Sequence, residues 1–233
     1  MGKIIAFSNQ KGGVGKTTTC VNMAAYLAAK GYKVLLVDLD PQGNATTGLG
    51  FAKSEVKNSV YNTMIDDMPL AAAVLTTETD NLDILPSNID LAGAEVELVY
   101  VKDREHVLKR VLDGAKNSYD FIAIDCPPSL GLLTINALAA ADTVMIPIQS
   151  EYYAMEGLSQ LMNTIRLVKK HLNAGLEIEG VVLTMKDNRA IISRQISNYL
   201  IELIYMKMLK RTSNIRRTVL EKRDGGSLYK CLI

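Results

Sequence analysis

The residues best suited to chemistry lie in one glycine-rich turn near the start of the chain. Residues 9–18 read NQKGGVGKTT, between an apolar run at 4–7 and a helix-like run that begins near Thr18. Glycines let successive backbone N–H groups point at one anion, and the following helix adds the positive end of its dipole. The turn therefore predicts a phosphate-binding loop. We expect a nucleotide to be bound by Lys11, Gly12, Gly13, Val14, Gly15, Lys16, Thr17 and Thr18.

Two residues of this turn have distinct expected roles. Lys16 would reach the β- and γ-phosphates of ATP, and the Thr17 hydroxyl would ligate Mg²⁺. The strict pattern G-x-x-x-x-G-K-[ST] is not met, because Gln10 stands where the first glycine is expected. A second lysine, Lys11, lies inside the loop. The alternative, an ordinary surface turn rich in Gly and Lys, requires strand, glycines, lysine and hydroxyls to coincide in this order by chance.

The loop resembles the deviant P-loop of the ParA/MinD group of ATPases, whose signature is the early lysine. In that group this lysine crosses a nucleotide-sandwiched dimer interface and contacts the phosphates held by the other subunit. Lys11 is the matching position in this chain. The resemblance implies that hydrolysis depends on dimerisation, and that Lys11 acts beside Lys16 somewhat as an arginine finger does in other phosphoryl-transfer enzymes.

A pair of carboxylates follows the second apolar run, in the segment 37–44, VDLDPQGN. Alternation along a strand puts Asp38 and Asp40 on the same side, where two like charges need a cation or water for compensation. The segment resembles the D-x-D-P-Q-G-N element of ParA/Soj proteins. By that likeness Asp40 is catalytic and orients the attacking water, while Asp38 helps to hold Mg²⁺ through water. The alternative is that both carboxylates only cap the following turn.

A third carboxylate, Asp125, ends the apolar run FIAID at 121–125. Many buried strands end in aspartate, so the weight of this motif comes from its position after the P-loop. It has the form of a Walker B element, with the carboxylate near the Mg²⁺ shell. The expected metal ligands are thus Thr17, Asp38 and Asp125. In the ParA/MinD group the loop that follows senses the γ-phosphate, and Gly131 provides a candidate hinge.

The elements that must position these residues alternate along the chain. Short runs rich in Ile and Val indicate buried parallel strands at 4–7, 34–37, 82–85, 121–124, 144–148 and 181–183. Helical patterns occupy 18–30, 104–116, 133–140 and 155–171. This order predicts an α/β fold with a doubly wound, mostly parallel sheet and helices on both faces. Ligands of such sheets bind at the carboxyl ends of the strands, where the P-loop lies. Residues 54–80 predict short helices over the nucleotide edge.

Composition bounds the remaining choices. A chain of 233 residues with 48% apolar content fits a single P-loop ATPase domain over 1–233. No apolar stretch is long enough to cross a bilayer of about 30 Å, and no signal-peptide pattern is present, so a cytoplasmic protein is expected. The three cysteines, Cys20, Cys126 and Cys231, form no C-x-x-C pair. This argues against a zinc site, a disulfide framework and iron-sulfur chemistry.

Positive charge gathers at the C-terminal end. Residues 186–230 hold eleven Lys/Arg against four Asp/Glu, whereas the rest of the chain holds fifteen against twenty-one. Such a segment either faces an anionic polymer or forms a solvated helix face. The sequence resembles ParA/Soj proteins continuously up to residue 185, and the resemblance weakens after that residue. Residues 186–233 form a divergent basic region without the family's P-R-N segment, leaving Asn214 a weak candidate for adenine contact. No convincing apolar strand ends it, so the C-terminus is expected to be altered or truncated.

The resemblance implies a function in partitioning chromosomal or plasmid DNA. We expect a cytoplasmic, nucleoid-associated, Mg²⁺-dependent ATPase that is slow until a ParB-like activator protein stimulates it. The ATP-bound homodimer would bind DNA without sequence preference, through Arg189, Arg194, Arg216 and Arg217. A MinD-like membrane-associated positioning ATPase, with an apolar and basic helix at 201–209, is the alternative. The sequence favours partitioning over membrane binding, because residues 40–44 resemble the corresponding segment of the partitioning proteins. Two further alternatives for the function are a nucleotide-dependent scaffold for metal or cofactor assembly and an inactive product of an altered gene.

Overall fold

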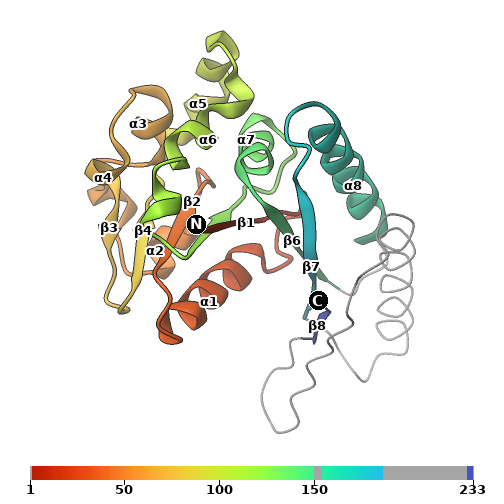
Figure 1. The fold of residues 1–233 in the computed structure, drawn as a ribbon, viewed down its shortest axis with the longest axis horizontal. Coiled ribbons are helices and arrows are strands. Elements are labelled where there is room, and N and C mark those ends of the chain that lie inside the picture. Colours follow the sequence, from red (N-terminus) through yellow and green to blue (C-terminus); the bar gives the residue numbers. More distant parts are fainter. Residues whose placement is uncertain (1, 150–153, 186–229, 233) are drawn as a thin grey trace, which may run out of the picture.

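The structure is a computed structural model that describes residues 2–149, 154–185 and 230–232. In this part of the chain one eight-stranded sheet runs through the molecule in the order β3-β4-β2-β5-β1-β6-β7-β8 (Figure 1). The strands are β1 (Lys3–Phe7), β2 (Val34–Asp38), β3 (Leu75–Thr76), β4 (Leu82–Leu85), β5 (Phe121–Asp125), β6 (Thr143–Gln149), β7 (Glu177–Thr184) and β8 (Lys230–Leu232).

The six central strands confirm the predicted doubly wound fold. β4, β2, β5, β1, β6 and β7 pair in parallel, and each contains one of the six apolar runs identified in the sequence. The two outermost strands, β3 and β8, pair antiparallel with their neighbours. The end of the chain, where the sequence shows no convincing apolar strand, contains the three-residue strand β8, in which Cys231 lies opposite Val182. Both edge strands are only two or three residues long, too short for a hydrophobic pattern to reveal them.

Helices cover both faces of the sheet (Figure 1). The α-helices are α1 (Lys16–Ala29), α2 (Asn44–Gly48), α3 (Val60–Ile65), α4 (Leu70–Ala73), α5 (Leu91–Glu97), α6 (Val107–Leu112), α7 (Leu132–Ala140) and α8 (Ala154–His171). The 3₁₀ turns are η1 (Lys53–Glu55), η2 (Leu98–Tyr100), η3 (Arg104–His106) and η4 (Ala115–Asn117).

Side-chain alternation along the strands builds a core on each face. In β1, Ile5 and Phe7 pack with Cys20 and Ala24 of α1, whereas Ile4 and Ala6 belong to the core under α3, α5, α6, α7 and α8. This two-sided burial explains why the strands appear in the sequence as unbroken apolar runs. It also holds the carboxyl ends of β1, β2 and β5 side by side.

The predicted helix at 104–116 was too long. The structure has η3, then α6, then η4, with α6 ending at Leu112. Asp103 before it takes a left-handed φ of 52°, and Gly114 follows Asp113 within the predicted range. Glycine and aspartate both have low helix propensity, so the apolar periodicity overstated the helix. The segment 54–80 does contain short helices, together with the unpredicted β3.

Candidate nucleotide-binding site

The predicted phosphate loop lies between β1 and α1, at the carboxyl edge of the sheet. Gly13 and Gly15 have φ values of 74° and 79°, in the left-handed region that favours glycine. Gly15 is the N-cap residue of α1, which begins at Lys16 and runs for 14 residues. A Cβ atom added to Gly13 would meet no atom within 4 Å. The loop is thus an open turn of backbone that leads into the amino end of a helix.

Two polar side chains attach this loop to the neighbouring strands. The Asn9 Nδ2 atom donates to the Pro147 carbonyl of β6 at 2.7 Å, and its Oδ1 atom accepts from the Lys11 amide at 3.0 Å. From β7, the buried Thr184 hydroxyl donates to the Val14 carbonyl at 2.8 Å. The loop therefore has a fixed position on the sheet.

Lys16 is the buried cation of the site. Its side chain is 7% exposed, and its Nζ atom donates to the Lys11 carbonyl at 3.2 Å. Burial lowers the pKa of Lys16, an effect opposed first by the negative charge of Asp125. Lys11 is half-buried in the same loop. The structure thus brings Lys16 close to Asp125 and Asp40, two of the three carboxylates that the sequence singles out.

Asp38 and Asp125 are register partners at the ends of adjacent parallel strands. Both are fully buried. Burial, and after it the charge of Asp38, raises the pKa of Asp125 to about 8. Burial also raises the pKa of Asp38 to about 6, although hydrogen bonds from Thr46 oppose this. Two adjacent buried carboxyl groups favour a bound cation or a proton.

The hydrogen bonds distinguish these two carboxylates. Asp38 Oδ2 accepts from both the amide and the hydroxyl of Thr46 at 2.7 Å, and Oδ1 accepts from the Asp40 amide at 3.3 Å. Neither oxygen of Asp125 has a hydrogen-bond partner of good geometry among the described residues, although the Thr17 hydroxyl lies close enough to lower the pKa of Asp125 in part. Asp125 is therefore the carboxylate with lone pairs available for a metal shell, whereas Asp38 also holds the turn into α2.

Asp40 lies just beyond β2 and is 6% exposed. Its Oδ1 atom accepts from the Gln42 amide at 2.9 Å, and its carbonyl accepts from the Gly43 amide at 2.8 Å. One carboxylate oxygen therefore closes a tight turn, as the turn-capping alternative requires.

The site fits a magnesium nucleotide by its chemistry. Mg²⁺ prefers oxygen ligands and is bound in such sites by one or two carboxylates together with substrate phosphates. The two unpaired oxygens of Asp125 and the Thr17 hydroxyl at the start of α1 meet this requirement. No group of three His, Cys, Asp or Glu residues that could hold a metal occurs in residues 2–149, 154–185 and 230–232. The phosphates would have to complete the shell.

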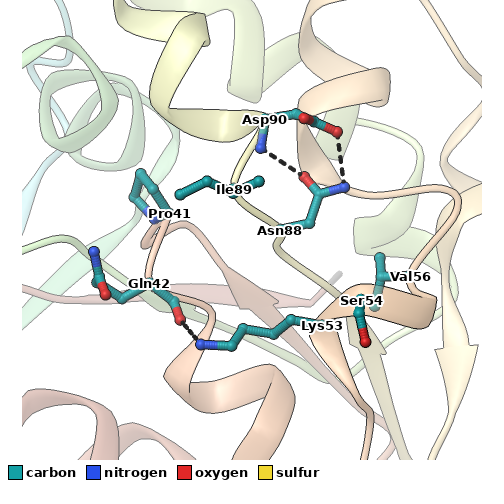
Figure 2. Close-up of a pocket in the computed structure, with 8 residues that line it drawn as sticks. All are labelled: Pro41, Gln42, Lys53, Ser54, Val56, Asn88, Ile89 and Asp90. Carbon is teal, nitrogen blue, oxygen red and sulfur yellow. Dashed lines mark hydrogen bonds between the residues drawn. The ribbon is translucent and has the colours of Figure 1, made fainter.

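A pocket of about 370 Å³ lies beside the Asp40 turn (Figure 2). Its lining residues are Pro41, Gln42, Lys53, Ser54, Val56, Asn88, Ile89 and Asp90. The Lys53 Nζ atom donates to the Gln42 carbonyl at 2.6 Å. The lysine stem passes close over Gly43, whose φ is 58°. This pocket is outside the phosphate loop, and Lys53 fixes the turn that carries Asp40.

Sequence reasoning missed the side chains that fix the site from other elements. Thr46, Thr184 and Ser87 are fully or almost fully buried, and the Ser87 amide donates to Thr46 Oγ1 at 2.9 Å. Hydroxyl groups are common in every part of a chain, so only their position after a strand could have singled out Thr184. The proposed DNA contacts Arg189, Arg194, Arg216 and Arg217, Asn214 and the 201–209 segment lie outside the described residues.

Cys20 and Cys126 are buried and unbridged, as expected for core residues. In the described ranges, no helix is long and apolar enough to cross a membrane.

Comparison with known proteins identifies relatives of both sequence and fold. Residues 2–178 match the AAA domain family. The chain is 56% identical over 220 residues to the sporulation initiation inhibitor protein Soj of Bacillus subtilis, covering 93% of this chain and 86% of Soj. It is 54% identical over 196 residues to the chromosome partitioning protein ParA of Myxococcus xanthus, covering 84% and 69% of the two chains.

A solved structure has the same fold. The cobyrinic acid a,c-diamide synthase of Mycobacterium smegmatis, with bound ADP and magnesium, superimposes with a TM-score of 0.83 at 42% identity. The match covers 87% of this chain and 82% of the other. Identity is higher to the two partitioning proteins, so the sequence comparison carries more weight than this structure's name.

Proposed function

Because the chain belongs to the ParA/Soj family of partitioning ATPases, we propose that it is a Mg²⁺-dependent ATPase that controls its own dimerisation and DNA binding. ATP would convert the chain to a homodimer that binds DNA without sequence preference. A ParB-like activator protein would accelerate an otherwise slow hydrolysis. We place residues 1–233 in one domain, with the basic region 186–233 as its DNA-contacting part.

We assign the roles from the positions of the side chains and from the resemblance to ParA/Soj proteins. Backbone amides from Gly12 to Thr17 and the Lys16 ammonium bind the phosphates, since the glycine turn opens directly onto the amino end of α1. Thr17 and Asp125 would hold Mg²⁺, which would neutralise charge on the phosphates. Asp38 keeps the Asp40 turn in place and would help to hold the metal through water. Asp40 orients the attacking water in line with the γ-phosphate.

Lys11 is the residue that would make hydrolysis depend on a second copy of the chain. Its backbone carbonyl lies against the Lys16 ammonium, so it stands at the phosphate end of the loop. From there its ammonium would contact the nucleotide of the partner subunit. The charge of each active site would then be fully compensated only in the ATP-bound dimer, which explains slow turnover in the monomer.

One observation supports this function most strongly. Asp125 is fully buried with two unpaired oxygens, and it lies beside the buried Lys16 ammonium and beyond an open glycine loop. An unpaired buried carboxylate is costly unless a cation completes it. A magnesium nucleotide supplies that cation and fills the loop at the same time.

The test is ATP-dependent DNA retention by the full chain over a salt series. Wild type is expected to bind DNA with Mg-ATP, with affinity falling steeply as salt rises. Lys16→Ala should lose DNA binding at every salt concentration because nucleotide is lost. Arg189→Glu should lose DNA but keep ATP. Arg166→Glu, on the exposed face of α8, serves as the control and should bind DNA nearly as wild type. DNA retention as strong as that of wild type in both Lys16→Ala and Arg189→Glu would contradict the partitioning function.

A further inference from the structure

The amino end of α7 receives its cap from another helix. Its N-cap residue, Gly131, has no side chain to offer. Instead, the Leu133 amide donates to Oε1 of Glu95, in α5, at 3.3 Å. The first amides of a helix lack partners within it, and the helix dipole is positive at this end. A carboxylate is therefore well suited to the position that Glu95 takes.

Glu95 reaches α7 only because residue 131 is glycine. A Cβ atom at Gly131 would collide with Oε1 of Glu95 and lie 3.0 Å from its Cδ atom. The backbone of Gly131 has φ −74° and ψ −171°, which any residue can adopt. The requirement for glycine here is therefore one of space, and the space is taken by the Glu95 carboxylate.

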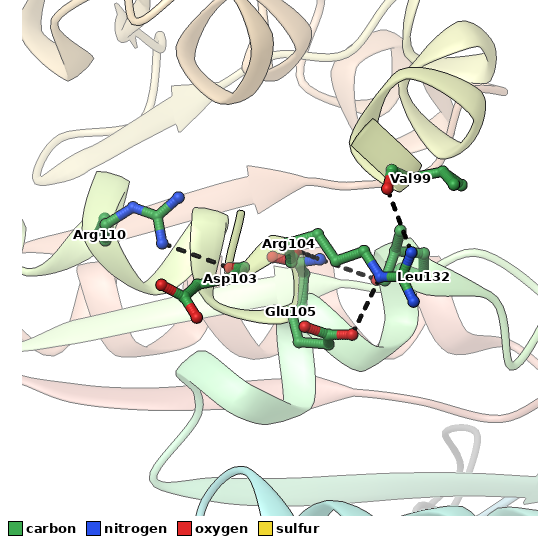
Figure 3. Close-up of polar contacts among 7 residues, drawn as sticks. Val99, Asp103, Arg104, Glu105, Arg110 and Leu132 are labelled. Atoms are coloured by element: carbon green, nitrogen blue, oxygen red, sulfur yellow. Dashed lines mark hydrogen bonds and ion pairs between the residues drawn. The ribbon is translucent and has the colours of Figure 1, made fainter. Parts of the chain in front are cut away.

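The helix that carries Glu95 is firmly held. Leu91, Ala94 and Leu98 are fully buried in a core cluster that α5 and η2 share with α3 and α7. The Arg104 Nη1 atom of η3 donates to the carbonyl of Val99, the middle residue of η2, at 3.2 Å (Figure 3). These contacts fix the direction from which the carboxylate approaches α7.

The same turn, η3, also holds α7 directly. The buried Asn136 side chain donates to the Arg104 carbonyl at 2.8 Å and accepts from the Leu108 amide at 3.1 Å. The body of α7 is thus attached to η3 and α6, while its amino end is attached to α5. Glu95 is the contact nearest to the loop that precedes α7.

That loop connects α7 to Asp125. Its first residue, Cys126, donates its amide to the Phe7 carbonyl at 3.2 Å, next to the phosphate loop. Near its other end, the Ser129 carbonyl accepts from the Thr134 hydroxyl at 2.8 Å. The 126–131 loop is therefore attached at one end to β5 and at the other end to the amino end of α7, which Glu95 caps.

We propose that Glu95 is a positioning residue for ATP hydrolysis: its carboxylate holds the amino end of α7 and so fixes the 126–131 loop beside Asp125. This inference rests on the proposed ATPase function. Glu95 acts through the loop and does not contact the nucleotide. Its loss is expected to slow the chemical step while leaving the binding of ATP to the phosphate loop almost unchanged.

A double-mutant cycle on the full chain tests this assignment. Glu95→Ala should lower kcat for Mg-ATP about tenfold, with KM within about twofold of wild type. Gly131→Ala should have the same effect, because the new methyl group displaces the carboxylate. The double variant should be no slower than either single variant, since both changes break one contact. Glu95→Gln keeps an acceptor oxygen and should retain more activity than Glu95→Ala.

Two further measurements exclude a general loss of structure. Glu97→Ala, in the same helix, removes an exposed carboxylate that accepts from the Tyr61 hydroxyl and should leave kcat unchanged. Amide hydrogen exchange at Leu133 should be faster in Glu95→Ala than in wild type. Unchanged kcat in Glu95→Ala, or losses that multiply in the double variant, would overturn the inference alone. A wild-type chain that cannot hydrolyse ATP would overturn the proposed function and this inference with it.

Discussion

At the scale of single residues, the site is organised around carboxylates that the fold keeps away from water. Asp38 and Asp125 are neighbours in register and both are fully buried. Asp38 offsets part of this cost with three hydrogen bonds, whereas the Asp125 carboxylate has only the nearby Thr17 hydroxyl, at poorer hydrogen-bond geometry. Asp125 is thus the residue whose charge state depends most on what binds beside it.

The first prediction concerns stability without ligand. A folded-state pKa near 8, against 3.8 for an ordinary Asp, means that the folded chain binds more protons than the unfolded chain in this window. The contribution of Asp125 to the free energy of unfolding therefore falls as pH rises from about 4 to 8. Asp125→Asn should be more stable than wild type at pH 8, by about 1–3 kcal/mol. Urea unfolding across this pH range measures the difference.

Its control is Asp113→Asn, which changes an exposed carboxylate of the same type. This variant should be about as stable as wild type at pH 8. If Asp125→Asn proves no more stable than wild type at pH 8, Asp125 does not carry the buried, unpaired charge that the structure assigns to it.

The second prediction concerns magnesium. Binding of the cation requires Asp125 to be ionised, and its raised pKa keeps it protonated at pH 6. The affinity of the full chain for Mg-ADP should therefore increase about fiftyfold between pH 6 and pH 8. Calorimetric titration at both pH values should also detect proton release. An affinity that is flat across this range, with no proton released, would argue that Asp125 lies outside the metal shell.

At the scale of elements, hydrophobic runs located the strands and failed to reveal what fixes the site. Buried parallel strands such as β2 and β5 are continuous apolar runs in any such sheet, so their positions and the carboxylates at their ends could be predicted. The 104–116 helix was overextended because periodicity does not show where Asp113 and Gly114 end it. Contacts such as that of Thr184 with the phosphate loop join residues far apart in sequence, so no local pattern encodes them.

The third prediction tests one of these contacts. Thr184→Val removes the hydroxyl that joins β7 to the Val14 carbonyl, leaving that carbonyl buried without its partner. Stability should fall by about 1–2 kcal/mol, and the KM for ATP should rise as the loop loosens. Thr143→Val in β6 is the matched control, because the Thr143 hydroxyl is buried with no partner among the described residues. That control should be neutral or stabilising. Equal effects from both changes would show that the Thr184 contact does not hold the loop.

At the scale of the whole molecule, one edge of the sheet collects every group proposed for hydrolysis. The phosphate loop, the Asp40 turn and the 126–131 loop follow β1, β2 and β5, which lie next to one another in the sheet (Figure 1). A surface of this kind can face a second copy across two nucleotides. We expect Lys11 to make dimerisation depend on bound ATP, because its ammonium would contact the nucleotide of the other copy.

The most direct test of the central claim is the mass of the full chain in solution, measured by light scattering with Mg²⁺ and a non-hydrolysable ATP analogue. Wild type should shift from 25.5 kDa to a dimer of about twice that mass, and should remain a monomer with ADP. Lys11→Ala should still bind the analogue but remain monomeric. A wild-type chain that stays at 25.5 kDa with the analogue bound, or a Lys11→Ala variant that dimerises equally well, would contradict the account.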